Sequence, residues 1–333
     1  MKRAPILVAT FAATIALAGC AGETVAPPTA ESAQSSSMPN LDTERIDSAL
    51  TNVSEALAAA DKAKDSTLFK GRLIDGAARM RSAQYTLAAA SGGELPELDM
   101  KPQNLAITNS STWPRAIINI TGRESAALPV VEVLVQQDPR SPYALTSWSR
   151  LLAGTSLTLP AISSGSGFVS DDATGFVLTP KEALNSYVAM LNAREVNTEK
   201  FTSDEYTTKY FDTLTQLSTN LAVAGTVTAQ VSASDMPICG VVMQDGSALV
   251  AAHFTYTLTY ARTIAKSTMR LGGQTAVLYD GEGDKVVGTA TAHYLGTVIL
   301  RIPSAKAGGQ IQVIGGERTI EKVDRDDSSN PDA

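Results

Sequence analysis

The stretch Val250-Ala251-Ala252-His253-Phe254-Thr255-Tyr256-Thr257-Leu258-Thr259-Tyr260 decides the fold of the C-terminal half of this 333-residue chain. Large apolar side chains alternate with small or polar ones, and this period of two predicts a strand with one apolar and one polar face. Further strand-forming runs follow at 274–279, 286–302 and 311–323, separated by turn-forming glycines. We therefore predict an antiparallel sheet that begins near Thr226.

Two helices are predicted immediately before this sheet. Thr179-Pro180-Lys181-Glu182 combines a capping threonine, a proline at the first helical position and a glutamate that completes a capping box. Ser203-Asp204-Glu205 opens the second helix, whose apolar stripe contains Tyr206, Tyr210, Leu214, Leu217 and Leu221. The C-terminal half is thus predicted to be a helix pair followed by a sheet.

The N-terminal half repeats this order. Apolar residues recur at helical spacing from Ile46 to Ala60, and a second helix is predicted from an N-cap at Ser66 to Gly92-Gly93. In the later run 130–136, valines alternate with Glu132, Leu134 and Gln136, which predicts a half-buried strand. The strand-forming runs of this half lie at 105–107, 115–121, 130–136 and 143–152.

The fold class that we predict is therefore α+β, with two consecutive modules that each contain a helix pair and a curved antiparallel sheet. Their predicted bounds are 41–162 and 178–323. A segment rich in glycine and serine, 163–177, is predicted to link them. The acidic segment 324–333 is predicted to be a disordered tail.

Residues 1–19 have the features of a lipoprotein signal peptide. Lys2 and Arg3 precede an apolar run that ends in Leu17-Ala18-Gly19-Cys20, a sequence that looks like a lipobox. We expect Cys20 to carry the lipid, 20–40 to form a disordered tether, and the folded part to lie outside the cytoplasm, anchored to the cell membrane. An uncleaved anchor or plain secretion is the alternative, but the run is short of the ~20 apolar residues that a membrane span needs.

Three motifs carry a resemblance to a known family: Trp113-Pro114-Arg115, Leu145-Thr146-Ser147-Trp148-Ser149-Arg150-Leu151-Leu152 and Leu178-Thr179-Pro180-Lys181-Glu182-Ala183. Together with the lipobox and the polar tether, they make the chain similar to an uncharacterised family of actinobacterial envelope lipoproteins. The repeated order of two helices and a curved sheet is similar to the NTF2-like/cystatin-like arrangement. These resemblances imply a location at the cell envelope and a ligand pocket on the concave side of the second sheet, and they bring no known activity.

The composition argues against several classes of function. The formal net charge is −7 and the chain contains no block of Lys or Arg residues, so we expect no nucleic-acid partner. With Cys20 acylated, Cys239 is left alone, and its apolar neighbours predict a buried thiol without a catalytic role. The sequence contains no zinc, phosphate-loop, dinucleotide or serine-hydrolase motif and no complete calcium loop, so we expect no metal, no cofactor and no catalytic residues.

The candidate ligand-binding residues are His253, Tyr256, His293 and Arg301. We expect both histidines on the polar face of the second sheet. If their strands were neighbours, the two rings could converge on a pocket there. The alternative is a pair of partly exposed sheet histidines without a ligand.

Trp113 and Trp148 are candidates for binding a protein partner, although tryptophans at such positions are more often core or sheet-edge residues. The function that we expect is a non-enzymatic binding or scaffold module at the cell envelope, with an unknown envelope protein or small ligand as its partner. One alternative is a solute- or lipid-binding module with a pocket in the second sheet. The other is an NTF2-like hydrolase or isomerase that uses His253, His293 or a buried carboxylate as its base.

Overall fold

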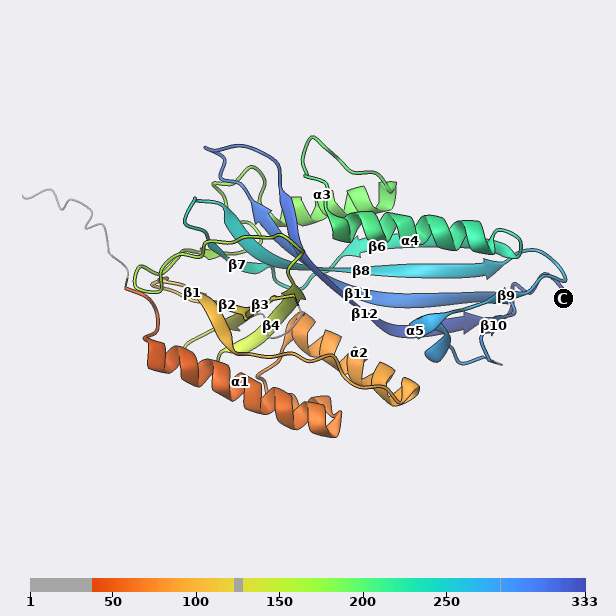
Figure 1. Ribbon diagram of the computed structural model, residues 1–333, viewed down its shortest axis with the longest axis horizontal. Helices are drawn as coiled ribbons and strands as arrows, with labels where there is room; N and C mark the ends of the chain where they lie inside the picture. Colours follow the sequence, from red (N-terminus) through yellow and green to blue (C-terminus); the bar gives the residue numbers. More distant parts are fainter. Residues whose placement is uncertain (1–37, 123–127, 282) are drawn as a thin grey trace, which may run out of the picture. The chain divides into compact units, whose positions relative to one another are not determined.

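The computed structural model describes residues 38–122, 128–281 and 283–333 (Figure 1). The predicted signal peptide, Cys20 and the tether as far as residue 37 lie outside the described residues. The described part is a mixed α+β fold in which the strands pair in antiparallel sheets. At this level, the predicted fold class is confirmed.

The helices and strands follow the predicted order in both halves. The N-terminal half contains α1 (Thr43–Ala63), the 3₁₀ helix η1 (Ser66–Phe69), α2 (Asp75–Ser91), β1 (Pro102–Ile107), β2 (Arg115–Thr121), β3 (Val130–Gln136) and β4 (Ala144–Arg150). The C-terminal half contains β5 (Phe168–Val169), α3 (Pro180–Ala193), α4 (Glu205–Leu221), β6 (Gly225–Ala233), β7 (Cys239–Val242), β8 (Ala248–Arg262), β9 (Met269–Arg270), α5 (Gly273–Val277), β10 (Lys285–Val286), β11 (Thr289–Ile302) and β12 (Gln312–Asp326).

Local sequence signals start α3 and α4 at the predicted positions. The Glu182 backbone N–H donates to the Thr179 hydroxyl, and the Thr179 N–H donates to the Glu182 carboxylate, which completes the capping box of α3. The Asp204 carboxylate caps α4 by accepting from the Thr207 N–H at 2.8 Å. Because each cap satisfies N–H groups that have no partner within the helix, the sequence encodes both starts locally.

The predicted start of the second helix is wrong, because the chain turns before it. Ser66–Phe69 forms only η1, and Lys70 and Gly71 then adopt φ angles of 48° and 73°. After this turn, α2 is held to α1 by a buried ion pair, in which Arg81 Nε and Nη2 donate to the Asp61 carboxylate at 2.8 and 2.6 Å.

The predicted strand at 274–279 is also wrong, because this segment forms the short helix α5. Strand β11 is already paired on both edges, with β8 and β12, and at the outer edge of β12 the segment makes an isolated bridge between Tyr279 and Val323. Gly272 and Gly273, two of the glycines that were expected to form turns between strands, instead lie at the start of this helix. The Thr275 and Tyr294 hydroxyls are hydrogen-bonded at 3.1 Å, which attaches α5 to the sheet.

The smaller sheet, in the order β1-β2-β3-β4, is covered on both faces. One face packs on α1 and α2, and the other packs on the larger sheet (Figure 1). The expectation of a half-buried β3 is therefore wrong: Glu132 on this strand is fully buried and accepts a 2.7 Å hydrogen bond from the Asn119 amide. Burial raises the pKa of Glu132 well above its usual range and favours the protonated acid.

The larger sheet has the strand order β12-β11-β8-β7-β5, and β6 also pairs with β8. Strand β8, of 15 residues, pairs with β11 on one edge and with β7 and then β6 on the other. Helices α3 and α4 cover the face that carries Phe254, Tyr256 and Leu258 (Figure 1). The smaller sheet and α2 pack on the opposite face, which carries His253.

The two halves of the chain are joined through this opposite face. Ile118 and Val133 of the smaller sheet belong to the same apolar cluster as Val241 and Ile299 of the larger sheet. The chain from Ser37 to Ala333 is one compact unit. The two blocks of helices and strands are therefore packed directly on each other.

Two segments that were predicted to be irregular contain structure. The predicted linker 163–177 includes β5, which pairs with β7 in the larger sheet. The predicted tail 324–333 begins inside β12, which runs to Asp326. Arg262 Nη1 donates to the Asp332 carboxylate at 2.8 Å and so holds the end of the chain against β8. Among the described residues, no helix is both long enough and apolar enough to cross a membrane.

Candidate functional site

A cavity of about 430 Å³ lies on the helix-covered face of the larger sheet. Its floor consists of residues that the strand register places side by side across three strands. Read from β8 through β11 to β12, one row is Tyr256, Tyr294 and Ile320. Arg318 on β12 lies in the adjacent row, two residues before Ile320.

Helix α4 forms the roof of this cavity, because its apolar stripe faces the sheet. Tyr210, Leu214 and Leu217 lie at helical spacing on that side. A smaller hollow of about 120 Å³ adjoins the cavity and shares Tyr210, Tyr256 and Arg318 with it. We call the two hollows together the tyrosine cavity. Its aromatic lining residues are Tyr187, Tyr206, Tyr210, Phe254, Tyr256, Tyr260 and Tyr294.

Contacts between the rings hold this lining in place. The Tyr256 and Tyr294 rings stack with their centroids 4.5 Å apart and an angle of 3° between their planes. The Tyr210 ring meets the Tyr256 ring edge-on, with centroids 5.7 Å apart and an angle of 83°. Because such contacts stabilise both rings in one position, the walls of the cavity are formed before any ligand arrives.

One hydroxyl group in this lining lacks a partner. Tyr187 and Tyr294 are hydrogen-bonded at 3.1 Å to Thr207 and Thr275 respectively. Tyr210 is 7% exposed, and its hydroxyl oxygen has no hydrogen-bond partner among the described residues. Burial raises the pKa of Tyr210 to about 12, so the group stays protonated and remains a donor.

Arg318 supplies the positive charge of the tyrosine cavity. It is an exposed residue, and its side chain lies close to the Tyr256 hydroxyl. In the described ranges, no carboxylate lies within salt-bridge distance of Arg318. Its neighbour Glu317 pairs instead with Arg150, while the Glu317 backbone carbonyl accepts a 3.1 Å hydrogen bond from Tyr206. The cavity therefore combines aromatic and leucine side chains with several polar groups, among them Glu317 and an Arg318 that has no carboxylate at salt-bridge distance among the described residues.

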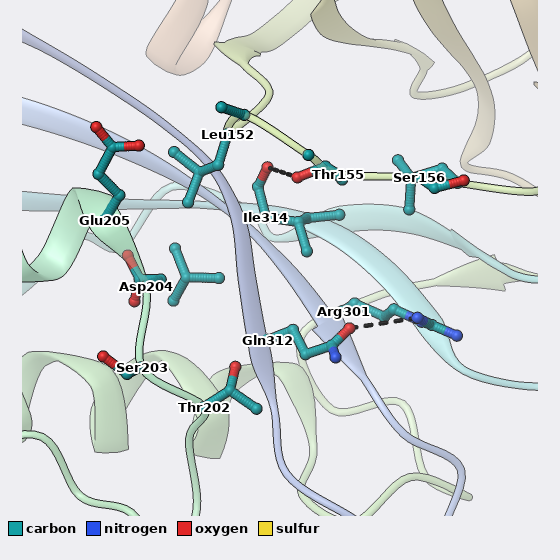
Figure 2. A pocket seen from close by; sticks show the side chains of 14 residues that line it. Leu152, Thr155, Ser156, Thr202, Ser203, Asp204, Glu205, Arg301, Gln312 and Ile314 are labelled. Atoms are coloured by element: carbon teal, nitrogen blue, oxygen red, sulfur yellow. Dashed lines mark hydrogen bonds between the residues drawn. The ribbon is translucent and has the colours of Figure 1, made fainter.

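A second cavity, of about 450 Å³, is mainly polar and lies beside the first turn of α4 (Figure 2). Figure 2 shows Asp204 and Ser203 on one side of the view and Arg301 on the other, with Gln312 between them. The second Asp204 oxygen has no hydrogen-bond partner in the described part of the chain, and burial raises the pKa of this carboxyl group. This cavity offers polar contacts but little apolar surface.

Arg301, one of the predicted ligand-binding residues, lines this polar cavity but is fully engaged there. Its Nη1 donates to Gln312 at 3.2 Å, its Nε donates to Ser247 at 3.3 Å, and its Nη2 pairs with Asp245. A guanidinium with this set of partners has little capacity left for a ligand. The polar cavity is therefore the weaker candidate site.

The two predicted histidines do not meet. His253 is 1% exposed, with Nε2 at 2.8 Å from the Ser147 hydroxyl and Nδ1 at 3.0 Å from the Thr297 hydroxyl. His293 lies on the same face but pairs with Thr257, four residues along β8, and this offset corresponds to about 13 Å. It is partly exposed, with Nε2 at 2.8 Å from the Asp324 carboxylate. Desolvation lowers the pKa of His253 to about 4, so its ring is neutral.

The remaining predicted residues are dispersed. Tyr256 lies in the tyrosine cavity, on the face opposite to both histidines. Trp113 stacks on the Arg115 guanidinium, with 4.2 Å between the charged carbon and the ring centroid, and its Nε1 donates to Gln136 at 3.2 Å. Trp148 is buried in the core beneath α1 and α2. The structure therefore brings Tyr256 into a cavity without any of the other predicted residues.

Metal-ligating side chains do not gather in the described part of the chain, where no group of three or more His, Cys, Asp or Glu residues is placed to hold an ion. Cys239 is buried, and desolvation raises the pKa of its thiol to about 12. A thiol with so high a pKa is a poor nucleophile at neutral pH.

The sequence contained a partial signal for the site. Tyr206 and Tyr210 were identified only as part of an apolar helix stripe, and Arg318 was not singled out. The stripe and the alternation in β8 each predicted an apolar face, and two apolar faces normally fill each other. Only the packing shows that α4 leaves a hollow above β11. Compared with known proteins, the chain matches no protein-family model, no curated protein and no solved structure.

Proposed function

We propose that this chain is a membrane-anchored, extracytoplasmic lipoprotein that binds a small, partly apolar ligand in the tyrosine cavity. One observation carries the ligand-binding proposal: Tyr210, whose buried hydroxyl has no partner among the described residues, lines a hollow of about 430 Å³. Ligand pockets typically measure about 300–1,000 Å³ and have mostly apolar and aromatic walls with a few polar groups. The tyrosine cavity has this size, and its aromatic and leucine side chains lie beside several polar groups.

The anchor rests on the N-terminal sequence. Lys2, Arg3, the apolar run and Leu17-Ala18-Gly19-Cys20 support acylation of Cys20, and the similarity to actinobacterial envelope lipoproteins points the same way. Changing Cys20→Ala is expected to move the protein from the detergent phase to the aqueous phase in a phase-partition assay. Continued retention in the detergent phase would contradict a lipid anchor.

We also assign the two blocks of helices and strands to the NTF2-like/cystatin-like arrangement. The element order, helix pair and then antiparallel strands, supports this assignment in both halves. The position of the tyrosine cavity, between a helix and the face of a sheet, agrees with the ligand pockets that such folds often contain.

Binding without catalysis fits the geometry better than a hydrolase does. Ser147 and His253 are hydrogen-bonded as in a nucleophile–base pair, but both are buried where the smaller sheet packs on the larger one. A base needs access to its substrate, and His253 has none in this position. The tyrosine cavity lies on the opposite face of the sheet.

Native mass spectrometry of the chain purified gently from the organism that makes it tests ligand binding. We expect a small-molecule adduct on the wild-type protein and its loss in Leu217→Trp, because the larger ring fills space between α4 and the sheet. Leu221→Trp is the matched control, since Leu221 lies on the same helix and does not line the cavity. An adduct that persists in Leu217→Trp would contradict the proposed site. A bare mass together with a captured envelope protein would favour the scaffold function instead.

A further inference from the structure

We infer that the ligand of the tyrosine cavity is an amphipathic monocarboxylate, whose acidic group binds Arg318 and Tyr210 and whose apolar body lies between α4 and β8. This inference rests on the proposed function and specifies the class of its ligand. It starts from a contrast between the arginine side chains of the larger sheet.

Arginines on this sheet other than Arg318 have carboxylate partners. Arg262 pairs with Asp332, Arg301 with Asp245 and Arg325 with Asp327. Arg318 on β12 has no carboxylate at salt-bridge distance within the described residues, although Glu317 is its neighbour in sequence. The Glu317 carboxylate is occupied by Arg150, and Lys209 at the edge of the smaller hollow pairs with Glu205. Arg318 is thus the cation at this cavity that is available to an anion.

The Tyr210 hydroxyl is the second polar group of the proposed site. Tyr210 lines both hollows, as Arg318 does, and its hydroxyl oxygen is buried without a partner among the described residues. A buried hydroxyl without a partner costs about 1–3 kcal/mol, and this cost is relieved when it donates a hydrogen bond to a ligand oxygen. The raised pKa of Tyr210 keeps the hydroxyl protonated, so it can donate to a carboxylate oxygen.

Part of the larger hollow suits an apolar body. Leu214 and Leu217 line it from α4, and Leu258 and Ile320 line it from the sheet, while Thr213, Gln274, Thr275 and Glu317 add polar groups to the lining. An alkyl chain that lies on the leucine and isoleucine side chains gains about 25 cal/mol for each Å² that it buries. One guanidinium and one hydroxyl fit a single carboxylate, which can accept from both at once.

Calorimetric titration with decanoate and with decanamide tests this class. The two probes have the same chain and differ in charge. Because residues 37–333 form a compact unit of their own, the non-acylated chain from Ala21 onward is a suitable sample. We expect decanoate to bind about tenfold more tightly than decanamide, since hydrogen bonds to charged groups are worth more than those to neutral groups.

Two variants and a control show whether Arg318 and Tyr210 are the groups that bind the probes. Arg318→Gln is expected to weaken decanoate binding about tenfold and to leave decanamide binding nearly unchanged. Tyr210→Phe should weaken both probes, because both carry an acceptor oxygen. Arg325→Gln, on the same strand and paired with Asp327, should change neither affinity.

Equal affinities for the two probes, unchanged by Arg318→Gln, would overturn the inference and leave ligand binding in the cavity intact. Failure of both probes to bind would overturn the inference together with the proposed function. These two outcomes are distinct.

Discussion

The two faces of the larger sheet carry different kinds of buried polar group. On the face that packs on the smaller sheet, the His253 ring lies between the Ser147 and Thr297 hydroxyls, and both of its nitrogens have partners. On the face beneath α4, the Tyr210 hydroxyl has no partner, and Arg318 has no carboxylate among the described residues. Around His253 the first face is packed against the smaller sheet, whereas the second face contains a cavity of about 430 Å³.

This difference suggests that one face of the larger sheet contributes mainly to folding stability and the other mainly to ligand binding. A filled interface with satisfied polar groups contributes to the free energy of folding, and any change there leaves a cavity or an unpaired group. A face with an unfilled hollow and an unpaired donor contributes less to stability but retains capacity for a ligand. Substitutions on the first face should therefore mainly lower the free energy of unfolding, whereas substitutions on the second face should mainly weaken ligand binding.

The largest expected effect is a loss of packing between the sheets. Ile118→Ala, in the filled interface, should lower the free energy of unfolding by about 2–5 kcal/mol. Leu217→Ala, at the half-buried edge of the tyrosine cavity, should cost less than about 1.5 kcal/mol, because its side chain borders space that is already empty. Denaturant unfolding measures both values. Equal losses would show that the two faces are packed alike.

A pH-dependent loss of stability is expected from His253. Its pKa is about 4 in the folded protein and 6.5 in the unfolded chain, so the unfolded chain binds more protons between these values. Stability should therefore be complete above pH 6.5 and fall by up to about 3 kcal/mol as the pH is lowered to 4.

The difference between wild type and His253→Gln isolates this contribution from the carboxyl groups that titrate in the same range. Unfolding free energies measured at pH 7 and pH 4 give the pH dependence of stability for the wild type and for the variant. If His253→Gln had the same pH dependence as the wild type, a neutral buried His253 would be ruled out.

The smallest effects, and the sharpest comparison, come from deleting one hydroxyl on each face. Ser147→Ala leaves one His253 nitrogen without a partner and should cost about 1–3 kcal/mol. Tyr210→Phe removes a hydroxyl that has no partner, so its effect on stability should be within about 0.5 kcal/mol of zero or favourable. Thermal unfolding of both variants measures this. A large loss in Tyr210→Phe would mean that its hydroxyl is already satisfied in the free protein.

Much of the fold could be predicted from the sequence because its signals are local. The capping box at Thr179, the cap at Asp204 and the alternation along 250–260 each depend on neighbouring residues, and the corresponding helices and strand are present. The wrong predictions had non-local causes. Glu132 alternates as a solvent-facing residue would, yet it is fully buried and hydrogen-bonded to Asn119 of the neighbouring strand. The segment 274–279 has strand propensity, yet it contributes most of α5, and Tyr279 makes an isolated bridge to Val323 of β12.

The candidate site was less predictable than the fold. Tyr256 was among the predicted ligand-binding residues and does line a cavity, but His253 and His293 lie on the other face of the sheet, and Arg301 lines a different cavity. Sequence alternation assigns a residue to a face without showing what covers that face. Tyr210 and Arg318 come from a helix and a strand more than 100 residues apart, so no local pattern could connect them.

By itself, the sequence determined most of the elements, the caps of α3 and α4, the strand periodicity and the expectation of a lipid-bearing Cys20, because each of these depends on residues within about one turn or one strand of each other. The tertiary structure alone decided which face of the larger sheet is filled and which is hollow. That outcome depends on how the smaller sheet, α2 and α4 fit the side chains of β8, β11 and β12. Packing at this level is a property of surfaces that meet in space, and the order of residues along the chain does not specify it.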